Sequence, residues 1–212
     1  MYSGLKFTKM SDKLVAISGL VEAINIRWQW KYVAGLWRES LAYGLCWKRE
    51  GPGKKSSTYR CPSWSWAPQD SAVRYNSVLE MELEASIINV EVDVDRRNQY
   101  GAVTSGSLTL HASLMRGIVP AQKSYRGEDE VSFRINDEVL TPALPAVWMD
   151  DDFFFCNEVY CVWLATDWMH RYGLILARTE QERTYRRIGI FEVNMSHTGG
   201  WPQIPKSEVV II

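Results

Sequence analysis

The chain has 212 residues, of which 46% are hydrophobic and 23% charged, a composition typical of one globular domain with a full apolar core. Its formal net charge of −1 gives no basic field that would attract nucleic acid, and it has no apolar run of about 18 residues that could span a bilayer. Ten tryptophans predict either a thick aromatic core or a cavity with aromatic walls.

Two helices are predicted in an N-terminal helical lead-in over residues 1–50. The first begins after Asp12, a good N-cap residue, and the second covers residues 31–49, where apolar residues recur at helical spacing. Glycine and proline at 51–53 are expected to end the second helix. The apolar faces contain Leu14, Ile17, Val21 and Ile24 in the first helix, and Val33, Leu36, Trp37, Leu41 and Leu45 in the second.

The stretch Tyr59–Pro68 joins this lead-in to the remainder of the chain. It holds two tryptophans, Trp64 and Trp66, between two prolines. Side chains two residues apart point to the same side of an extended segment, so both indoles are expected on one face. This stretch is the densest apolar part of the sequence.

Downstream, the pattern has the period of two that is typical of strands. Residues 80–93 alternate charged and apolar residues and slip in phase at Ile87–Ile88, which indicates a bulge. Asp150–Asp152 is expected as a solvated turn, and the basic run Arg183–Arg187 as a solvated loop or strand face. Further strands are expected at 107–114, 131–135, 158–165, 172–178, 187–193 and 208–212, with a loop at 125–130 and a turn at 141–145.

The sequence therefore predicts a single domain over residues 1–212, with a β-rich body at 59–212. Its fold class is α+β, with two N-terminal helices packed on a mainly antiparallel β-sandwich or barrel of about eight strands, because helices and strands do not alternate. The beginning of the chain has no signal-peptide pattern, which predicts an intracellular, cytoplasmic protein. The cysteines are expected to be reduced, buried thiols at Cys46, Cys61, Cys156 and Cys161.

Several segments resemble one family, the fungal HET (heterokaryon incompatibility) domain proteins. Residues 12–20 are similar to the helix that follows the HET domain, and Ala34–Trp37, Leu45–Trp47 and Pro62–Trp66 are similar to the family's AGLW, LLW and PSWSW motifs further on. The segments 173–176 and 185–191 are similar to its closing hairpin. The resemblance covers most of the chain.

This resemblance implies the fold of the family's C-terminal region and a filamentous-fungal source. The HET domain itself, the TIR-like part that triggers cell death, would precede residue 1 and is absent from this sequence. The cell-death activity of the family is therefore not implied for this chain.

Motifs for metal, nucleotide or covalent chemistry are missing. The sequence has no GxSxG, HExxH or GxGxxG pattern, and its three histidines are isolated, although Asp167 and His170 are spaced as a carboxylate–imidazole pair. We expect no cofactor and no metal, and we interpret the Asp167–His170 pair as a surface pair.

A sheet domain rich in aromatic residues can enclose an apolar pocket for a hydrophobic small molecule. Such a pocket accelerates a one-substrate cyclisation by holding the substrate in a reactive shape, with hydrogen-bond donors that polarise a carbonyl. Candidate donors are Tyr59, Arg60 and His111, although a strand residue on the wet face is the plainer interpretation of His111. Candidate wall residues, each of which could instead be core, are Trp37, Trp47, Trp64, Trp66, Trp163 and Trp201.

Two functions remain open from the sequence. The first is a stand-alone small-molecule-binding protein that acts as a cofactor-free cyclase or isomerase, such as an intramolecular Diels–Alderase, on an apolar fungal metabolite. The second is a non-catalytic recognition module derived from a HET-type protein. The first predicts a pocket and the second an exposed apolar patch. The sequence does not specify the oligomeric state.

Overall fold

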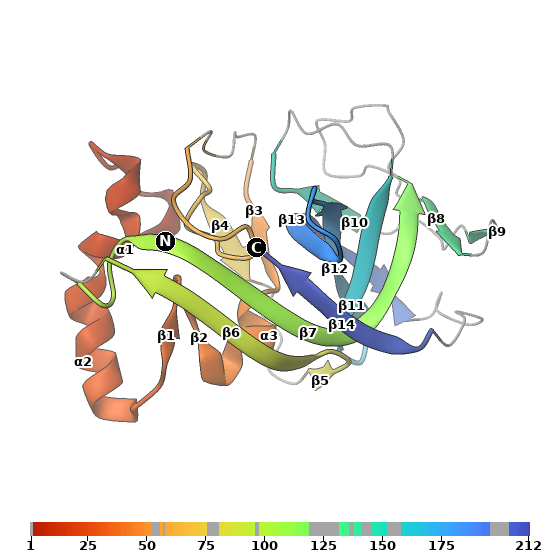
Figure 1. The fold of residues 1–212 in the computed structure, drawn as a ribbon, viewed down its shortest axis with the longest axis horizontal. Helices are drawn as coiled ribbons and strands as arrows, with labels where there is room; N and C mark the ends of the chain where they lie inside the picture. Colours follow the sequence, from red (N-terminus) through yellow and green to blue (C-terminus); the bar gives the residue numbers. More distant parts are fainter. Residues whose placement is uncertain are drawn as a thin grey trace.

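Short helices and hairpins at the N-terminal end pack against a long, curved sheet in the computed structural model of the chain (Figure 1). The structure describes residues 2–51, 56, 58–75, 81–95, 98–118, 132–135, 138–140, 146–151, 158–195 and 204–212. Within these ranges, no helix has the length and apolar character that crossing a membrane requires. The predicted loop at 125–130 and turn at 141–145 lie outside the described residues.

The first predicted helix is present as two consecutive helices, α1 (Lys13–Ala16) and α2 (Ser18–Trp28), which follow 3-10 turns at Tyr2–Gly4 and Met10–Asp12. Leu14 and Val21 of its predicted apolar face are buried. The helix ends at Gln29, which takes a left-handed conformation with φ 56°.

The second predicted helix, over residues 31–49, is wrong in extent. Its first part is the hairpin of β1 (Tyr32–Val33) and β2 (Leu36–Trp37), followed by a 3-10 turn, the four-residue helix α3 (Leu41–Gly44) and β3 (Trp47–Arg49). The hairpin turn needs positive φ at Ala34 (49°) and at Gly35 (93°), which ends any helix there.

A tertiary contact explains this turn. A Cβ atom at Gly35 would lie 2.9 Å from Nε1 of Trp66, so the indole occupies the space of a side chain. Trp66 also donates a hydrogen bond to the Gly35 carbonyl at 2.8 Å. Packing against a tryptophan far along the chain has therefore overridden the local helical pattern.

Ten of the described strands join in one sheet. Five of them close into a ring: β7 pairs with β11 and with β14, while β11, β12, β13 and β14 pair in order. Only the β13–β14 pairing in this ring is parallel. The predicted α+β, mainly antiparallel fold is thus confirmed. The strands of the sheet are β5 (Glu82–Leu83), β6 (Ser86–Val94), β7 (Val103–Ile118), β8 (Ser132–Ile135), β9 (Glu138–Leu140), β10 (Ala146–Met149), β11 (Val159–Thr166), β12 (His170–Arg178), β13 (Thr184–Asn194) and β14 (Lys206–Ile211).

Strand predictions from the period of two are largely confirmed, although the single strand expected at 80–93 is divided into β5, which pairs with β11, and β6, which pairs with β7. The β6–β7 register shifts between Ile87 and Asn89, so Ile88 is the extra residue of the expected bulge. On β7, Leu108, Leu110 and Ala112 are fully buried, as the alternation predicted. The predicted C-terminal hairpin is β12–β13.

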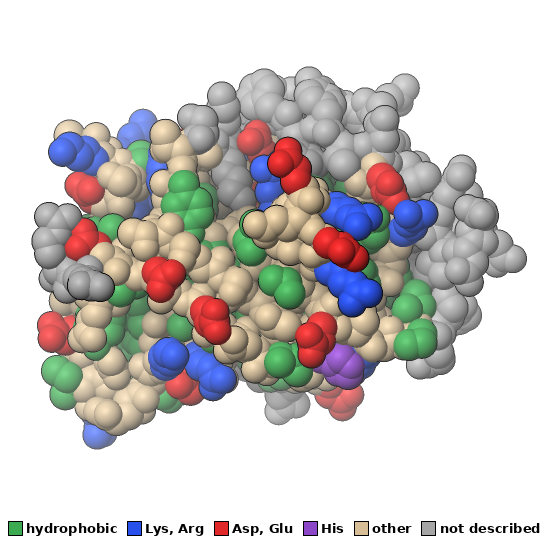
Figure 2. Space-filling view, in the orientation of Figure 1, with side chains coloured by type: hydrophobic (Ala, Val, Ile, Leu, Met, Phe, Trp, Pro, Cys, Tyr) green, Lys and Arg blue, Asp and Glu red, His purple; other side chains and the backbone are tan. Residues whose placement is uncertain are grey.

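The core has two parts. In the larger part, one face of all five ring strands packs against the N-terminal elements and the Tyr59–Pro68 stretch. In the smaller part, the other face of β11, β12 and β13 packs with β10. Figure 2 shows that acidic and basic side chains are interspersed on the surface seen in Figure 1.

Candidate functional site

The tryptophans of the Tyr59–Pro68 stretch lie in solid core. Trp64 is fully buried, and Trp66 has 7% of its surface exposed. Trp47, also fully buried, donates a hydrogen bond from Nε1 to the Trp64 carbonyl at 3.1 Å. Ser65 donates to the Ala34 carbonyl at 2.6 Å, which ties the stretch to the β1–β2 turn. These contacts make the three indoles part of the architecture.

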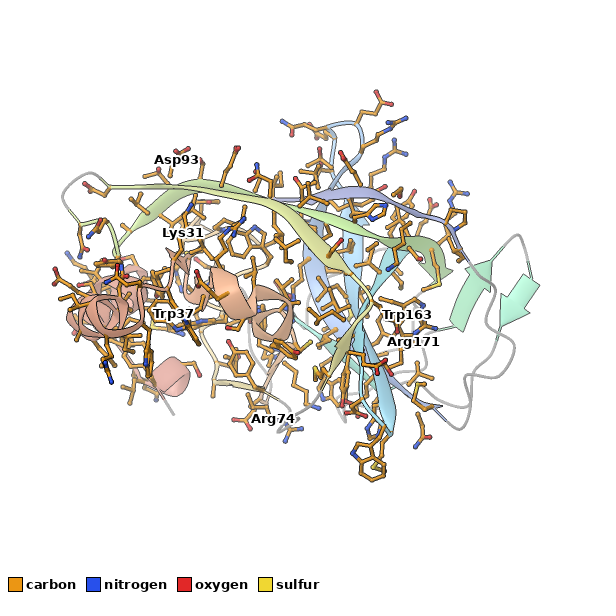
Figure 3. All side chains as sticks on the ribbon, turned by 90° about the horizontal axis from the view of Figure 1, so that it is seen from below. Lys31, Trp37, Arg74, Asp93, Trp163 and Arg171 are labelled. Atoms are coloured by element: carbon orange, nitrogen blue, oxygen red, sulfur yellow. The ribbon has the colours of Figure 1, made fainter. Side chains whose placement is uncertain are left out.

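The remaining predicted wall residues lie apart from one another. Trp37, among the N-terminal elements, lines a hollow of about 390 Å³ with Tyr43 and Tyr75. Trp163 packs on Phe191 in the smaller core part and lies under the guanidinium of Arg171, at the other end of the molecule (Figure 3). Trp201 lies outside the described residues. The described candidates therefore do not surround one common cavity.

Two of the predicted donors, in contrast, lie together in a cleft of about 700 Å³, here called the Tyr59 cleft. A pocket of this volume accommodates a small organic molecule. Tyr59 and Arg60 form part of its wall, and the third candidate donor, His111, lies elsewhere, exposed on β7 opposite Ser86 and Glu208. The cleft is lined by the segments around Tyr59, Ser105, Asp150, Thr179 and Arg187, and by Pro68 and Ile212.

The Tyr59 ring is 57% exposed. Partial burial, together with the nearby Cys61 and Asp93, raises the pKa of its hydroxyl to about 12. The hydroxyl therefore keeps its proton at neutral pH and can donate a hydrogen bond into the cleft. Arg60 forms an ion pair with Asp70, which fixes its guanidinium and leaves further N–H groups for a ligand.

A buried ion pair contributes to the lining of the cleft. Asp150, directly after β10, is 1% exposed, and Arg187 of β13 is fully buried. Arg187 Nε lies 3.2 Å from Asp150 Oδ2, and its other nitrogens donate to the carbonyls of Leu45 and Trp47 at 2.6 Å each. The guanidinium also lies 3.4 Å from the centre of the Trp47 ring. Burial lowers the pKa of Arg187, and Asp150 opposes that shift.

A bulge in β13 directs Arg187 inwards. The β12–β13 register shifts so that Ile175 pairs with Gly189 and Leu176 with Arg187, leaving Ile188 as the extra residue. A bulge re-aims side chains in this way. The Arg187 backbone N–H then donates to Ser63 Oγ at 2.8 Å, which anchors the strand to the Pro62–Trp66 motif.

Sequence reasoning missed both residues of this pair. It placed Asp150 in a solvated turn and Arg187 on a solvated face, and both interpretations are wrong. The sequence carries no signal for either residue, because Ile188 and Ile190 keep the period of two across the bulge.

One oxygen of Asp150 has no partner. Oδ2 accepts from Arg187, but Oδ1 is buried and accepts no hydrogen bond from any residue that the structure describes. Buried polar atoms are almost always paired in native proteins, so this atom, on a residue that lines the cleft, is a candidate acceptor for a ligand or solvent donor. The lining of the cleft thus combines two side-chain donors, Tyr59 and Arg60, with one carboxylate acceptor.

The described residues offer little support for covalent catalysis by a thiol. Cys46, Cys61 and Cys161 are free, buried thiols, as predicted, and Cys156 lies outside the described residues. Cys61 borders the cleft, but burial raises the pKa of its thiol to about 12, so little reactive thiolate is present at neutral pH. No group of three potential metal ligands occurs in the described ranges.

The Asp167–His170 pair forms no helical turn. Asp167 lies in the β11–β12 turn, where its carboxylate accepts hydrogen bonds from the backbone N–H groups of Met169 and His170 and from the Tyr172 hydroxyl. His170 Nδ1 is 3.9 Å from Asp167 Oδ1, a loose contact. The hydrogen bonds to Asp167 therefore stabilise the β11–β12 turn.

The fold and the cleft define the class of the protein: an α+β protein with a closed ring of five strands and a small-molecule-sized cleft at the junction with its N-terminal elements. Comparison of the chain with protein-family models, with curated proteins and with solved structures finds no match.

Proposed function

We propose that the chain is a small-molecule-binding protein whose ligand, a largely apolar molecule, occupies the Tyr59 cleft. The observation that carries this proposal is the meeting of Tyr59 and Arg60 with the half-satisfied Asp150 in one cleft of about 700 Å³. Apolar surface from Pro68, Ile188 and Ile212 supplies the hydrophobic contacts that such a ligand needs.

The chemistry that suits this cleft is a cofactor-free cyclisation or isomerisation, such as an intramolecular Diels–Alder reaction. The cleft holds a flexible substrate in the reactive shape, and the Tyr59 hydroxyl and Arg60 guanidinium donate hydrogen bonds to a substrate carbonyl. These hydrogen bonds lower the energy of the lowest empty orbital of the electron-poor alkene and so lower the barrier to its reaction with the diene. All atoms of the substrate stay in the product, and no oxidant or reductant is needed.

A linear trienone, a chain with a conjugated diene and an enone, tests both parts of the proposal. Equilibrium dialysis measures its binding, and chiral chromatography measures the rate and stereochemistry of its cyclisation with protein and in buffer. We expect binding, a faster reaction and one favoured enantiomer. Thr104→Trp, which fills the cleft, should abolish all three, whereas the exposed control Thr8→Trp should not. Rate and stereochemistry equal to those in buffer would refute the cyclase, and absence of dialysis binding would refute the binding site.

We also propose that the chain is related to the C-terminal region of HET proteins. The three motifs that carry the resemblance contact one another: Trp66 lies over Gly35, and Trp47 bonds to the Trp64 carbonyl. Motifs that depend on one another physically are expected to occur together. A structure of a HET-protein C-terminal region tests this, since its second PSWSW indole should cover the AGLW glycine.

A second candidate function is the recognition module, favoured by exposed aromatic residues at the end of α2. Trp28 is 57% exposed and Trp30 37%, and their rings lie 5.6 Å apart, with Trp37 next to Trp30 at 6.1 Å. Tryptophans of this kind are common at protein interfaces. A second copy of the chain serves as the probe partner.

Sedimentation velocity over a wide range of protein concentrations measures this self-association. We expect Trp28→Ser with Trp30→Ser to abolish it, and the control Trp168→Ser, at a still more exposed position, to leave it unchanged. A wild-type chain that remains monomeric throughout would contradict self-recognition by this surface.

A further inference from the structure

The Asp150 carboxylate has one oxygen that accepts a hydrogen bond and one buried oxygen without a hydrogen-bond partner. Oδ2 is held by Arg187, and the backbone N–H of Asp150 donates to the Ile188 carbonyl at 2.8 Å, so the residue is fixed at two points. Oδ1 has no hydrogen bond within the described part of the chain, although the side chain is 98% buried. Burying a charged acceptor without a hydrogen bond is unfavourable in free energy, and a donor that bonds to it recovers most of that free energy.

The charge of this buried pair is already balanced. Arg187 and Asp150 form a neutral pair, and Arg187 has neither freedom nor space to turn away, because the carbonyls of Leu45 and Trp47 and the Trp47 ring hold it. A cationic ligand at Oδ1 would leave one buried charge uncompensated, and an anionic ligand would be repelled by Asp150. A neutral donor fits both the hydrogen-bond and the charge requirements.

The surroundings of Oδ1 indicate the rest of the ligand. Ile188 follows Arg187 on β13, and Ile212 and Pro68 also border the cleft, so apolar surface lines the same cleft as Asp150. Tyr59 and Arg60 offer donors. The cleft is thus complementary to a molecule with an apolar body, a donor for Asp150 and an acceptor such as a carbonyl for Tyr59 and Arg60.

We propose that Asp150 Oδ1 accepts a hydrogen bond from a neutral O–H or N–H group, so that the ligands of the Tyr59 cleft are apolar alcohols, phenols or amides. This inference rests on the proposed binding function of the cleft. It makes Asp150 the residue that selects the ligand class, and it assigns recognition to the buried carboxylate, whereas Tyr59 and Arg60 act as donors.

Four probes with the same naphthalene body test the inference on the wild-type chain by isothermal titration calorimetry. They are 2-naphthol, its methyl ether, the 2-naphthylmethylammonium ion and 2-naphthoate. We expect 2-naphthol to bind about tenfold tighter than the methyl ether, a difference of about 1.4 kcal/mol. The ammonium ion and the carboxylate should both bind more weakly than 2-naphthol.

The wild-type results separate two failures. If 2-naphthol and its ether bind equally and Thr104→Trp blocks both, the cleft is a binding site but solvent satisfies Oδ1, and the inference is overturned. If the ammonium ion binds tightest, the neutral-donor requirement is overturned. If none of the probes binds, the proposed binding function fails together with the inference.

Asp150→Asn supplies the matched variant. An asparagine that keeps its oxygen towards Arg187 presents Nδ2, a donor, to the cleft, so the preference for 2-naphthol over its ether should fall to about one. Asp12→Asn, at an exposed aspartate outside the cleft, should keep the tenfold preference. An unchanged preference in Asp150→Asn would overturn the inference. Should Asp150→Asn fail to fold, the wild-type probe series still decides.

Discussion

The two ends of the Tyr59–Pro68 stretch have opposite environments. At one end, Trp64 and Trp66 are enclosed by core and make contacts that specify the N-terminal fold. At the other end, only a few residues away, Tyr59 is more than half exposed and borders a cleft. The aromatic content of the stretch belongs mainly to the first end, while the groups able to bind a ligand belong to the second.

The difference shows how a core can support a cleft without being part of it. Arg187 links the tryptophan end to the cleft: its backbone N–H donates to Ser63 beside Trp64, and its guanidinium pairs with Asp150, which lines the cleft. The tryptophans fix the position of the strand that carries Arg187, and Arg187 fixes the acceptor. Substitutions at the two ends should therefore have different effects on stability and on ligand binding.

The largest effect is expected for Trp64→Ala. Removal of a fully buried indole leaves a cavity, so the free energy of unfolding should fall by about 4 kcal/mol. Urea denaturation followed by circular dichroism measures it. Trp168→Ala, at a position that is 86% exposed, is the control and should change stability by less than about 0.5 kcal/mol. Equal losses in both variants would contradict the assignment of Trp64 to solid core.

Arg187→Met should cost about 3 kcal/mol, because it leaves Asp150 buried without its charge partner. Adding Asp150→Leu to that variant should recover part of the loss, since no uncompensated charge then remains. Chemical denaturation of both single variants and the double variant forms the test. Additive losses would show that the two side chains are not coupled.

Ser65→Ala should cost about 1–2 kcal/mol, because it removes the buried hydroxyl that donates to Ala34 and accepts from the Ala67 N–H. Ser11→Ala, on the surface, provides the matched control. The hydrogen-exchange protection of the β1–β2 hairpin should fall together with stability in Ser65→Ala. Unchanged hydrogen-exchange protection of the hairpin in Ser65→Ala would argue against its attachment to the tryptophan end.

A carboxylate with all its partners offers a contrast to Asp150. Burial tends to raise the pKa of Asp167, but hydrogen bonds from Tyr172, His170 and Met169 outweigh it and lower the pKa below its ordinary value. Its stabilising contribution is therefore present above about pH 4 and is lost as the pH falls through the lowered pKa. Asp167→Asn should cost about 1 kcal/mol at neutral pH.

Thermal denaturation of wild type and Asp167→Asn between neutral and acidic pH checks this sign. The difference between the two proteins should shrink as the pH falls. A difference that stays constant down to strongly acidic pH would contradict the role assigned to the ionised Asp167.

The smallest effect on stability is expected for Tyr59→Phe, below about 0.5 kcal/mol, because the ring is largely exposed. Its effect on function should be larger: the rate of trienone cyclisation should fall while binding of the apolar body changes little. The cyclisation rate at saturating trienone measures the effect on the reaction, and the dissociation constant from equilibrium dialysis measures the effect on binding. A rate equal to that of wild type would remove Tyr59 from the proposed chemistry.

Much of the sheet could be predicted from the sequence, because a strand with one buried face carries its period of two in its own residues. Even the bulge at Ile88 left a visible slip in that period. The prediction of a helix at 31–49 is wrong because Trp37, Leu41 and Leu45 have helical spacing by coincidence. The turn at Gly35 depends on Trp66, which local pattern cannot reveal.

The residues that line the cleft could be predicted only in part. Tyr59 and Arg60 were named as donors, and the structure brings them into one cleft. Asp150 and Arg187 were missed because their burial follows from a strand bulge and from a pairing between distant segments. An aspartate beside another aspartate and an arginine in a basic run look like surface residues until the partner of each is known.

The most direct test of the contrast between the two ends is a nuclear magnetic resonance titration of the 15N-labelled chain with 2-naphthol. We predict that amide signals of Tyr59, Arg60 and the Thr179 and Ser105 segments shift, whereas the indole N–H signals of Trp47, Trp64 and Trp66 do not. Shifts concentrated on those indoles, with Tyr59 and Arg60 unaffected, would contradict the account, because the ligand would then occupy the tryptophan core.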